Sequence, residues 1–148
     1  MGAQESIGTI LRAAATLPAT YDAAGYGALT PTAVGEITEI PTFGGQAETI
    51  THTPLATGIT EKFQGAINYG SLTVPLAFDR DDAGQVILKA AFASKARIAF
   101  EVEYPDGSFD YFSGKVMSEI RRGSTVSGVL GGDVMIEIET PLVEVAAT

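Results

Sequence analysis

The sequence contains no cysteine and a single histidine, and both facts narrow the chemistry that the chain can perform. Without cysteine there is no disulfide, no thiolate metal ligand and no thiol nucleophile. The histidine, His52, stands among threonines, where a lone histidine is more often a surface residue than a catalyst. A transition-metal site would need carboxylates alone. We therefore expect no cofactor and no metal.

Basic residues and long apolar runs are also scarce. The chain has 9 Lys and Arg against 18 Asp and Glu, a net charge of −9, and Arg12 is the one basic residue among the first 60. Because affinity for nucleic acid comes from Lys and Arg that displace counterions, stable DNA binding is not expected. No stretch reaches the roughly 20 mainly apolar residues that span a bilayer, which predicts no membrane insertion. The 148 residues are enough for one domain with a core.

Patterns that resemble known functional motifs are broken in this chain. The segment 79–84 begins like a calcium loop, but Ala83 and Ala90 stand where ligands are required. Gly114 and Lys115 are followed by Val116, not by the Ser or Thr of a phosphate-binding loop. Pairs of acids at alternate positions are typical of a solvated sheet face, not of a glycosidase. The sequence therefore predicts no enzyme. These acid pairs are Glu101/Glu103, Asp106/Asp110 and Glu137/Glu139.

Alternation of apolar and polar residues predicts three strands. In 71–78 Leu72 begins one apolar face, and 97–104 and 134–139 alternate in the same way. Pro75 cannot donate a ladder hydrogen bond, which places the first of these strands at a sheet edge or beside a bulge.

A helix is predicted over 83–94, with Asp82 as its N-cap. The segment 6–17 fits a helix by the spacing of its aliphatic residues, but Gly8 and Thr9 weaken that interpretation. The apolar stripe expected on the helix consists of Val86, Ile87, Ala90, Ala91 and Ser94.

The segment 101–114 predicts a hairpin with a type I turn at Pro105-Asp106-Gly107. This turn sets Phe100 opposite Phe112. A two-residue turn at Asp106-Gly107 would instead set Glu103 opposite Asp110, which like charges disfavour. In either register Phe109 and Tyr111 point away from the face of Phe112. The hairpin is therefore expected to meet its own core on one face and another subunit on the other.

The segment 41–70 has no clear period and is interrupted by glycines and prolines. Loops of this length usually have a function, and a merely solvated loop would not need seven apolar residues. Those residues are Phe43, Ile50, Leu55, Ile59, Phe63, Ile67 and Tyr69.

The order of these features resembles the tail tube (major tail) proteins of long-tailed, lambda-like bacteriophages. The features that carry the resemblance are GTIL at 8–11, VGEITEI at 34–40, NYGSLTVPLAF at 68–78, the helix, the hairpin YPDGSFDYFSGKV at 104–116 and VMIEIET at 134–140. The hairpin is the most specific of them, and the remainder matches by order and spacing.

The resemblance implies a mainly β fold, in which two packed antiparallel sheets form a barrel-like sandwich flanked by one α-helix. A long loop and flexible termini complete this single tail tube domain over 1–148, without an immunoglobulin-like C-terminal extension. It also favours a first strand within 6–17. Subunits would form hexameric rings that stack into a tube, with 41–70 reaching the adjacent ring.

Further implications concern partners and location. The chain would meet itself, a tape-measure protein, a tail terminator and distal tail or baseplate proteins. It would reside in the virion tail, and in the host cytoplasm during assembly. DNA would pass through the tube without specific binding, because carboxylates on the inner wall repel phosphates.

Three sets of residues follow as candidate sites. The seven apolar residues of 41–70 are candidates for contacts between rings. Tyr104, Phe109, Tyr111 and Phe112 are candidates for contacts between subunits. The candidates for the lumen wall are Glu101, Glu103, Asp110, Glu137 and Glu139.

Two other functions remain open. One is a related injection-tube protein of a contractile tail or secretion system. The other is a ligand- or carbohydrate-binding β-sandwich, in which Tyr104, Phe109 and Tyr111 would stack on sugars.

Overall fold

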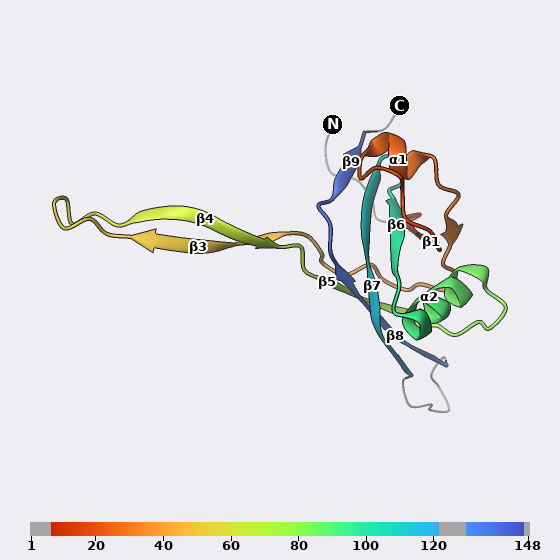
Figure 1. Ribbon diagram of the computed structural model, residues 1–148. Coiled ribbons are helices and arrows are strands. Elements are labelled where there is room, and N and C mark those ends of the chain that lie inside the picture. Colours follow the sequence, from red (N-terminus) through yellow and green to blue (C-terminus); the bar gives the residue numbers. More distant parts are fainter. Residues whose placement is uncertain (1–6, 122–129, 147–148) are drawn as a thin grey trace.

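A computed structural model describes residues 7–121 and 130–146, which form two helices and nine strands (Figure 1). In chain order these are β1 (Ile10–Ala14), α1 (Ala23–Gly27), β2 (Thr32–Ala33), β3 (Gln46–His52), β4 (Glu61–Asn68), β5 (Ser71–Ala77), α2 (Ala83–Ser94), β6 (Arg97–Glu103), β7 (Phe109–Arg121), β8 (Gly131–Ile138) and β9 (Val143–Val145). The predicted flexible termini lie largely outside the described residues. Neither helix of the described ranges is long and apolar enough to cross a membrane.

Seven strands form one antiparallel main sheet. Six of them follow the order β2-β1-β6-β7-β8-β5, and β9 pairs with β7 outside this order. The thirteen-residue β7 is its longest strand, and it pairs with β6 along one edge and with β9 and then β8 along the other. The three strands predicted from alternation are β5, β6 and β8. β5 lies at the edge of the sheet, which confirms the position expected from Pro75. β1 confirms the first strand within 6–17.

The hairpin of β6 and β7 has the register expected from a type I turn. Phe100 is paired with Phe112, and the backbone N–H of Tyr104 donates to the carbonyl of Ser108 at 2.9 Å. Gly107 has a φ of +90°, a conformation that glycine adopts without steric cost. Glu103 is paired with Phe109, so it does not face Asp110.

The helix α2 begins at the predicted N-cap. The Asp82 carboxylate accepts from the backbone N–H of Gln85 at 2.9 Å and from that of Gly35 at 3.0 Å, so it both caps the helix and ties it to the chain after β2. Glycine is required at position 84, because a Cβ there would lie 2.3 Å from the carbonyl oxygen of Ala33.

The buried side of α2 differs from the predicted stripe. Leu88 and Ala91 are buried and Ile87 packs partly against the core, whereas Val86 is 51% exposed. Ala90 and Ser94 are exposed as well. The helix is therefore rotated about its axis relative to the expectation, because Gly84 allows the backbone to approach closely and turns Leu88 inward.

The main core lies between the main sheet and a layer made of α2 and segment 34–43. Phe100 and Phe112 stack at its centre, with ring centroids 5.3 Å apart. Two antiparallel sheets are present, as predicted. However, the second sheet, β3 and β4, contributes no buried residue to this core. The helix and the segment thus occupy the place that a packed second sheet would take.

A second, smaller core covers the opposite side of the main sheet, which we call the Tyr26 face. Tyr26 of α1 stacks on Tyr111 with ring centroids 5.2 Å apart, and Ala14 and Ala99 belong to the same buried cluster. Its hydroxyl lies 2.8 Å from that of Ser113, and both are buried. The expectation that another subunit covers this side of the hairpin is therefore wrong where α1 packs, because the chain covers that part itself.

The stability of α2 packing can be tested by truncation. Leu88→Ala should lower the free energy of unfolding by about 2–5 kcal/mol, because the Leu88 side chain is 2% exposed and its removal leaves a cavity. Val86→Ala, two residues earlier and half exposed, should cost less than about 1 kcal/mol. Urea denaturation followed by circular dichroism measures both. Equal losses in the two variants would show that the helix packs by the stripe expected from the sequence.

Candidate assembly surfaces

β3 and β4 form a two-stranded hairpin that projects from the body (Figure 1). The segment 41–70 is therefore not an irregular loop, because residues 46–52 and 61–68 pair in register with one irregularity between Ala47 and Thr49. At about 3.3 Å per residue the paired part extends about 25 Å. Isolated two-stranded hairpins are marginally stable in water. A surface that covers this arm would therefore stabilise it.

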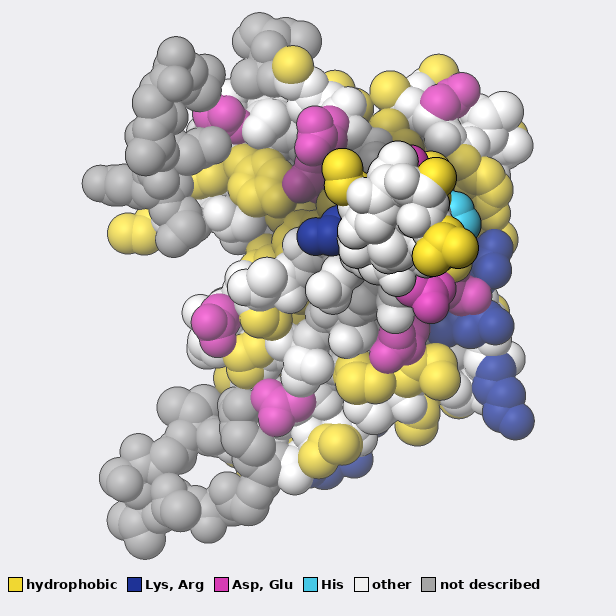
Figure 2. All heavy atoms as spheres, turned by 90° about the vertical axis from the view of Figure 1, so that its left-hand side faces the viewer, with side chains coloured by type: hydrophobic (Ala, Val, Ile, Leu, Met, Phe, Trp, Pro, Cys, Tyr) yellow, Lys and Arg dark blue, Asp and Glu magenta, His cyan; other side chains and the backbone are white. Residues whose placement is uncertain are grey.

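The arm exposes apolar side chains along one face and at its tip. Ile50 and Phe63 form a cross-strand pair and are each about half exposed, while Thr51 and Lys62 point to the other face. Leu55 at the tip is fully exposed. Figure 2 looks onto this tip and shows hydrophobic side chains facing the viewer. The candidates exposed on the arm are Ile50, Leu55, Ile59, Phe63 and Ile67.

The other two inter-ring candidates lie at the root of the arm. Phe43 and Tyr69 are partly buried against the main core, and the ring of Phe43 lies 5.9 Å from that of Phe112. They anchor the arm to the body and have less surface available to a neighbour than the five exposed residues.

The four aromatic residues proposed for subunit contacts are mostly occupied within the chain. Phe112 is 0% exposed and Tyr111 is 8% exposed, so Phe112 has no surface left for a partner. Phe109 is half-buried and stacks on Tyr111, and the Tyr104 hydroxyl donates to the Asp110 carboxylate at 2.6 Å. Of the three residues that would stack on a sugar, Tyr111 is buried, and Tyr104 and Phe109 are half-buried.

The five lumen candidates fall on two faces of the main sheet. Asp110 is paired with Val102 and lies on the side of the main core. The register places the other four on the Tyr26 face, where Glu137 is opposite Lys115. These four are Glu101, Glu103, Glu137 and Glu139.

Most of the acids on the Tyr26 face have a cation beside them. One nitrogen of Arg12 lies 2.6 Å from both Glu101 and Glu103, and Arg97 lies 3.0 Å from Glu139. Burial alone would lower the pKa of Arg12, but its hydrogen bonds to the two carboxylates and their charges outweigh that and raise the pKa. Among the described residues no ion pair includes Glu137. Of the four candidates on this face, Glu137 is therefore the one outside the ion pairs found among the described residues, although Lys115 lies opposite it in the sheet.

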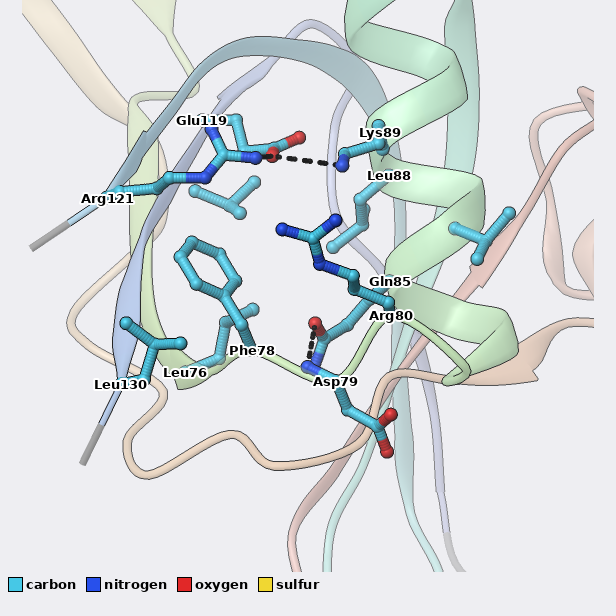
Figure 3. Close-up of a pocket in the computed structure, with 12 residues that line it drawn as sticks. Leu76, Phe78, Asp79, Arg80, Gln85, Leu88, Lys89, Glu119, Arg121 and Leu130 are labelled. Atoms are coloured by element: carbon cyan, nitrogen blue, oxygen red, sulfur yellow. Dashed lines mark hydrogen bonds and ion pairs between the residues drawn. The ribbon is translucent and has the colours of Figure 1, made fainter.

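A cavity of about 300 Å³ opens at the end of the body away from α1, between α2 and the ends of β5, β7 and β8 (Figure 3). We call it the end pocket. Its interior is apolar and includes Leu76, Phe78, Leu88 and Val134, whereas its border is formed by Val86, Leu130, Arg80, Lys89 and Arg121. No group of three or more potential ligands that could hold a metal ion occurs in the part of the chain that the structure describes.

The family model described as "Lambda phage tail tube protein, TTP" matches residues 32–136, well over half of the chain. The chain belongs to this family. The match begins at β2 and includes the projecting arm, α2 and the β6–β7 hairpin. No curated protein matches the sequence.

Solved structures show the same fold as this tail tube family chain. A chain of the virion of a native gene transfer agent (GTA) particle is 18% identical, with a TM-score of 0.69 over 97% of this chain and 100% of that chain. A chain of the tail of an empty GTA particle with C6 symmetry is 19% identical, with a TM-score of 0.68 over 97% of this chain and 100% of that chain. A chain of the anti-feeding prophage baseplate is 8% identical, with a TM-score of 0.71 over 100% of this chain and 99% of that chain. At these identities the likeness is one of fold.

Several features of this tail tube protein were not predicted from the sequence patterns. The run Thr49-Ile50-Thr51 is β-branched and predicts a strand, but glycines and prolines nearby obscured it. The helix α1 is only five residues long, and its one signal is Asp22, which caps it by accepting from Gly25 N–H. The end pocket draws on four separate segments, so no local pattern could reveal it.

Alkaline pH should destabilise this tail tube protein in part through Tyr104. Burial, aided by the hydrogen bond to Asp110, raises the pKa of Tyr104 far above its ordinary value of about 10. The unfolded chain ionises there first, so stability is full below about pH 10 and falls as the pH rises further. Tyr104→Phe should make that fall shallower, in chemical denaturation between pH 9 and 11. Tyr21→Phe, at an exposed tyrosine, is the control, and parallel slopes for Tyr104→Phe and wild type would contradict the prediction.

Proposed function

We propose that this chain builds the wall of a tail tube, by assembling into hexameric rings that stack along the tail. Membership of the tail tube family supports the proposal. The fold shared with the six-fold symmetric tail of the GTA particle supports the ring of six. The proposed location is the virion tail, with the chain passing through the host cytoplasm during assembly.

The observation that carries the proposal is the exposed arm. β3 and β4 bury none of their residues in the body, yet they present large apolar side chains to water. Burying apolar surface contributes about 25 cal/mol per Å², so the arm is stabilised only when another molecule covers it. A second copy in the adjacent ring would provide that cover.

The proposal also gives the Tyr26 face a function. The part of it that α1 leaves open would line the bore, where carboxylates repel the phosphates of passing DNA. Ion pairs with Arg12 and Arg97 reduce the charge of three acids. Glu137 then contributes most to the repulsion, together with the chain's net charge of −9.

The remaining parts of the proposal concern role and partners. The chain acts as a structural protein over 1–148 as one tube domain, without catalysis. It would meet a tape-measure protein inside the tube, a tail terminator at one end, and distal tail or baseplate proteins at the other.

A second candidate is an injection tube of a contractile system. The observation in favour of this candidate is the shared fold with the anti-feeding prophage baseplate, with a TM-score of 0.71. The family match favours the non-contractile tail. Tubes purified from producing cells decide between the two, since a contractile system carries a sheath protein around the tube and a lambda-like tail does not.

Removing the arm should separate folding from assembly. Replacing residues 47–67 by Asn-Gly leaves Gln46 and Asn68 joined by a two-residue turn, which suits an antiparallel pair. The main core is untouched, so the melting temperature should stay within a few degrees of wild type. Negative-stain microscopy should show no tubes.

The control for this deletion is the double variant Thr49→Ala/Thr51→Ala on the polar face of the arm, which should still form tubes. Long tubes formed by the deletion variant would show that the arm is not required for stacking.

The bore can be tested through Glu137. Glu137→Lys repeats a positive charge around every ring, so tubes should look normal while particles deliver DNA poorly. The defect should ease at higher salt, since the Debye length falls from about 10 Å at 0.1 M to about 3 Å at 1 M. Glu39→Lys, an exposed acid on the segment that covers the main core, should deliver normally. Unchanged delivery by Glu137→Lys particles would place the Tyr26 face outside the bore.

A further inference from the structure

The end pocket is built to receive an apolar group from another molecule. Its interior is lined mainly by aliphatic side chains and Phe78, and Val86 and Leu130 at its border are each more than half exposed. A cavity of about 300 Å³ with an open mouth has room for one or two aliphatic side chains. Burial of this apolar lining lowers the free energy only when an occupant displaces the water from the cavity.

The rim of the end pocket carries excess positive charge. Glu119 lies 4.0 Å from Lys89 and 3.5 Å from Arg121, and the Arg121 guanidinium also lies over the Phe78 ring at 5.3 Å. Arg80 extends toward the cavity in Figure 3 and takes part in no ion pair among the described residues. The carboxylate of Asp79 points away from the cavity. An occupant that carries a carboxylate beside its apolar group would therefore be favoured.

The tip of the arm has this combination. Leu55 is fully exposed and Ile59 is 68% exposed. Glu61 follows at the first paired position of β4, opposite His52, and shares a face with Phe63. Lys62 points to the opposite face, so the side of the arm that carries the apolar residues near the tip is acidic.

The arm of the same chain cannot fill the end pocket. In Figure 1 the hairpin leaves the body on the side away from α2, a helix that lines the pocket, and its tip lies far from that helix. The tip of this arm and the pocket of this body are therefore both left for other copies.

Resting on the proposed function, we propose that the end pocket of one subunit receives the arm tip of a second copy in the adjacent ring. Leu55 enters the apolar interior beside Val86 and Leu130. Glu61 lies at the rim and pairs with Arg80. The contact joins unlike surfaces and leaves a free arm at one end of the stack and a free pocket at the other, so it can propagate along the tube.

Disulfide trapping tests this contact directly, because the chain has no native cysteine. Because Cys is smaller than Leu and Val, the double variant Leu55→Cys/Val86→Cys should need a higher protein concentration than wild type to assemble under reducing conditions, and it is assembled at that concentration. Mild oxidation should then give a ladder of covalent multimers on a denaturing gel. The matched control is Ile7→Cys/Val86→Cys, since Ile7 is an aliphatic residue that is 84% exposed elsewhere on the body. It should remain monomeric on the same gel.

The results distinguish a failure of the pocket assignment from a failure of the proposed function. Tubes whose Leu55→Cys/Val86→Cys subunits do not cross-link, or whose Ile7→Cys controls cross-link equally, overturn the pocket assignment and leave the tube proposal standing. Failure of the wild-type chain to form tubes, alone and with its tail tip proteins, overturns the proposed function and the pocket assignment with it.

A charge exchange provides a second measurement that needs no cysteine. Arg80→Glu and Glu61→Arg should each raise the protein concentration needed for tube formation at least about threefold, the size expected for a coupled charge pair. The double variant should return close to the wild-type concentration. Additive defects in the double variant would show that the two residues do not meet.

Discussion

The fold depends on β7 placing aromatic side chains on both of its faces. Phe112 points into the main core and Tyr111 into the smaller core under α1, so one strand holds together the two layers that cover the main sheet. The same strand pairs with β6, β8 and β9. Its register is strongly determined, because a slip by one residue would move Phe112 and Asp110 to the Tyr26 face and Tyr111 to the side of the main core.

The molecule divides into a body whose cores are complete and an arm that has none. The body buries Tyr26, Phe100 and Phe112 and satisfies its buried hydroxyl groups within the chain, as the contact of Tyr26 with Ser113 shows. The arm leaves its largest side chains in water. A subunit of this kind can fold before it assembles, while the part that recognises other copies remains accessible.

Prediction from sequence succeeded where one local pattern determined the structure. Alternation in 71–78 and 97–104, the N-cap Asp82 and the Pro105-Asp106-Gly107 turn each describe their own element, and all appear as expected. The rotation of α2 was not predictable, because it depends on Gly84 meeting the backbone of Ala33, which is distant in the sequence. The same reason explains Phe112, whose aromatic character fits a core and an interface equally well. The end pocket exists only after α2 and the strand ends meet.

The arm has a consequence for how tightly rings hold each other. In a ring of six, a neighbour would be held by six identical contacts at once, and after the first forms the others become intramolecular. If each contributed about 1.4 kcal/mol, one contact would favour association about tenfold and six up to about a millionfold. Two free subunits would thus part readily while two rings would not. Whole rings would therefore persist on the stack, whereas single subunits added out of place would be lost.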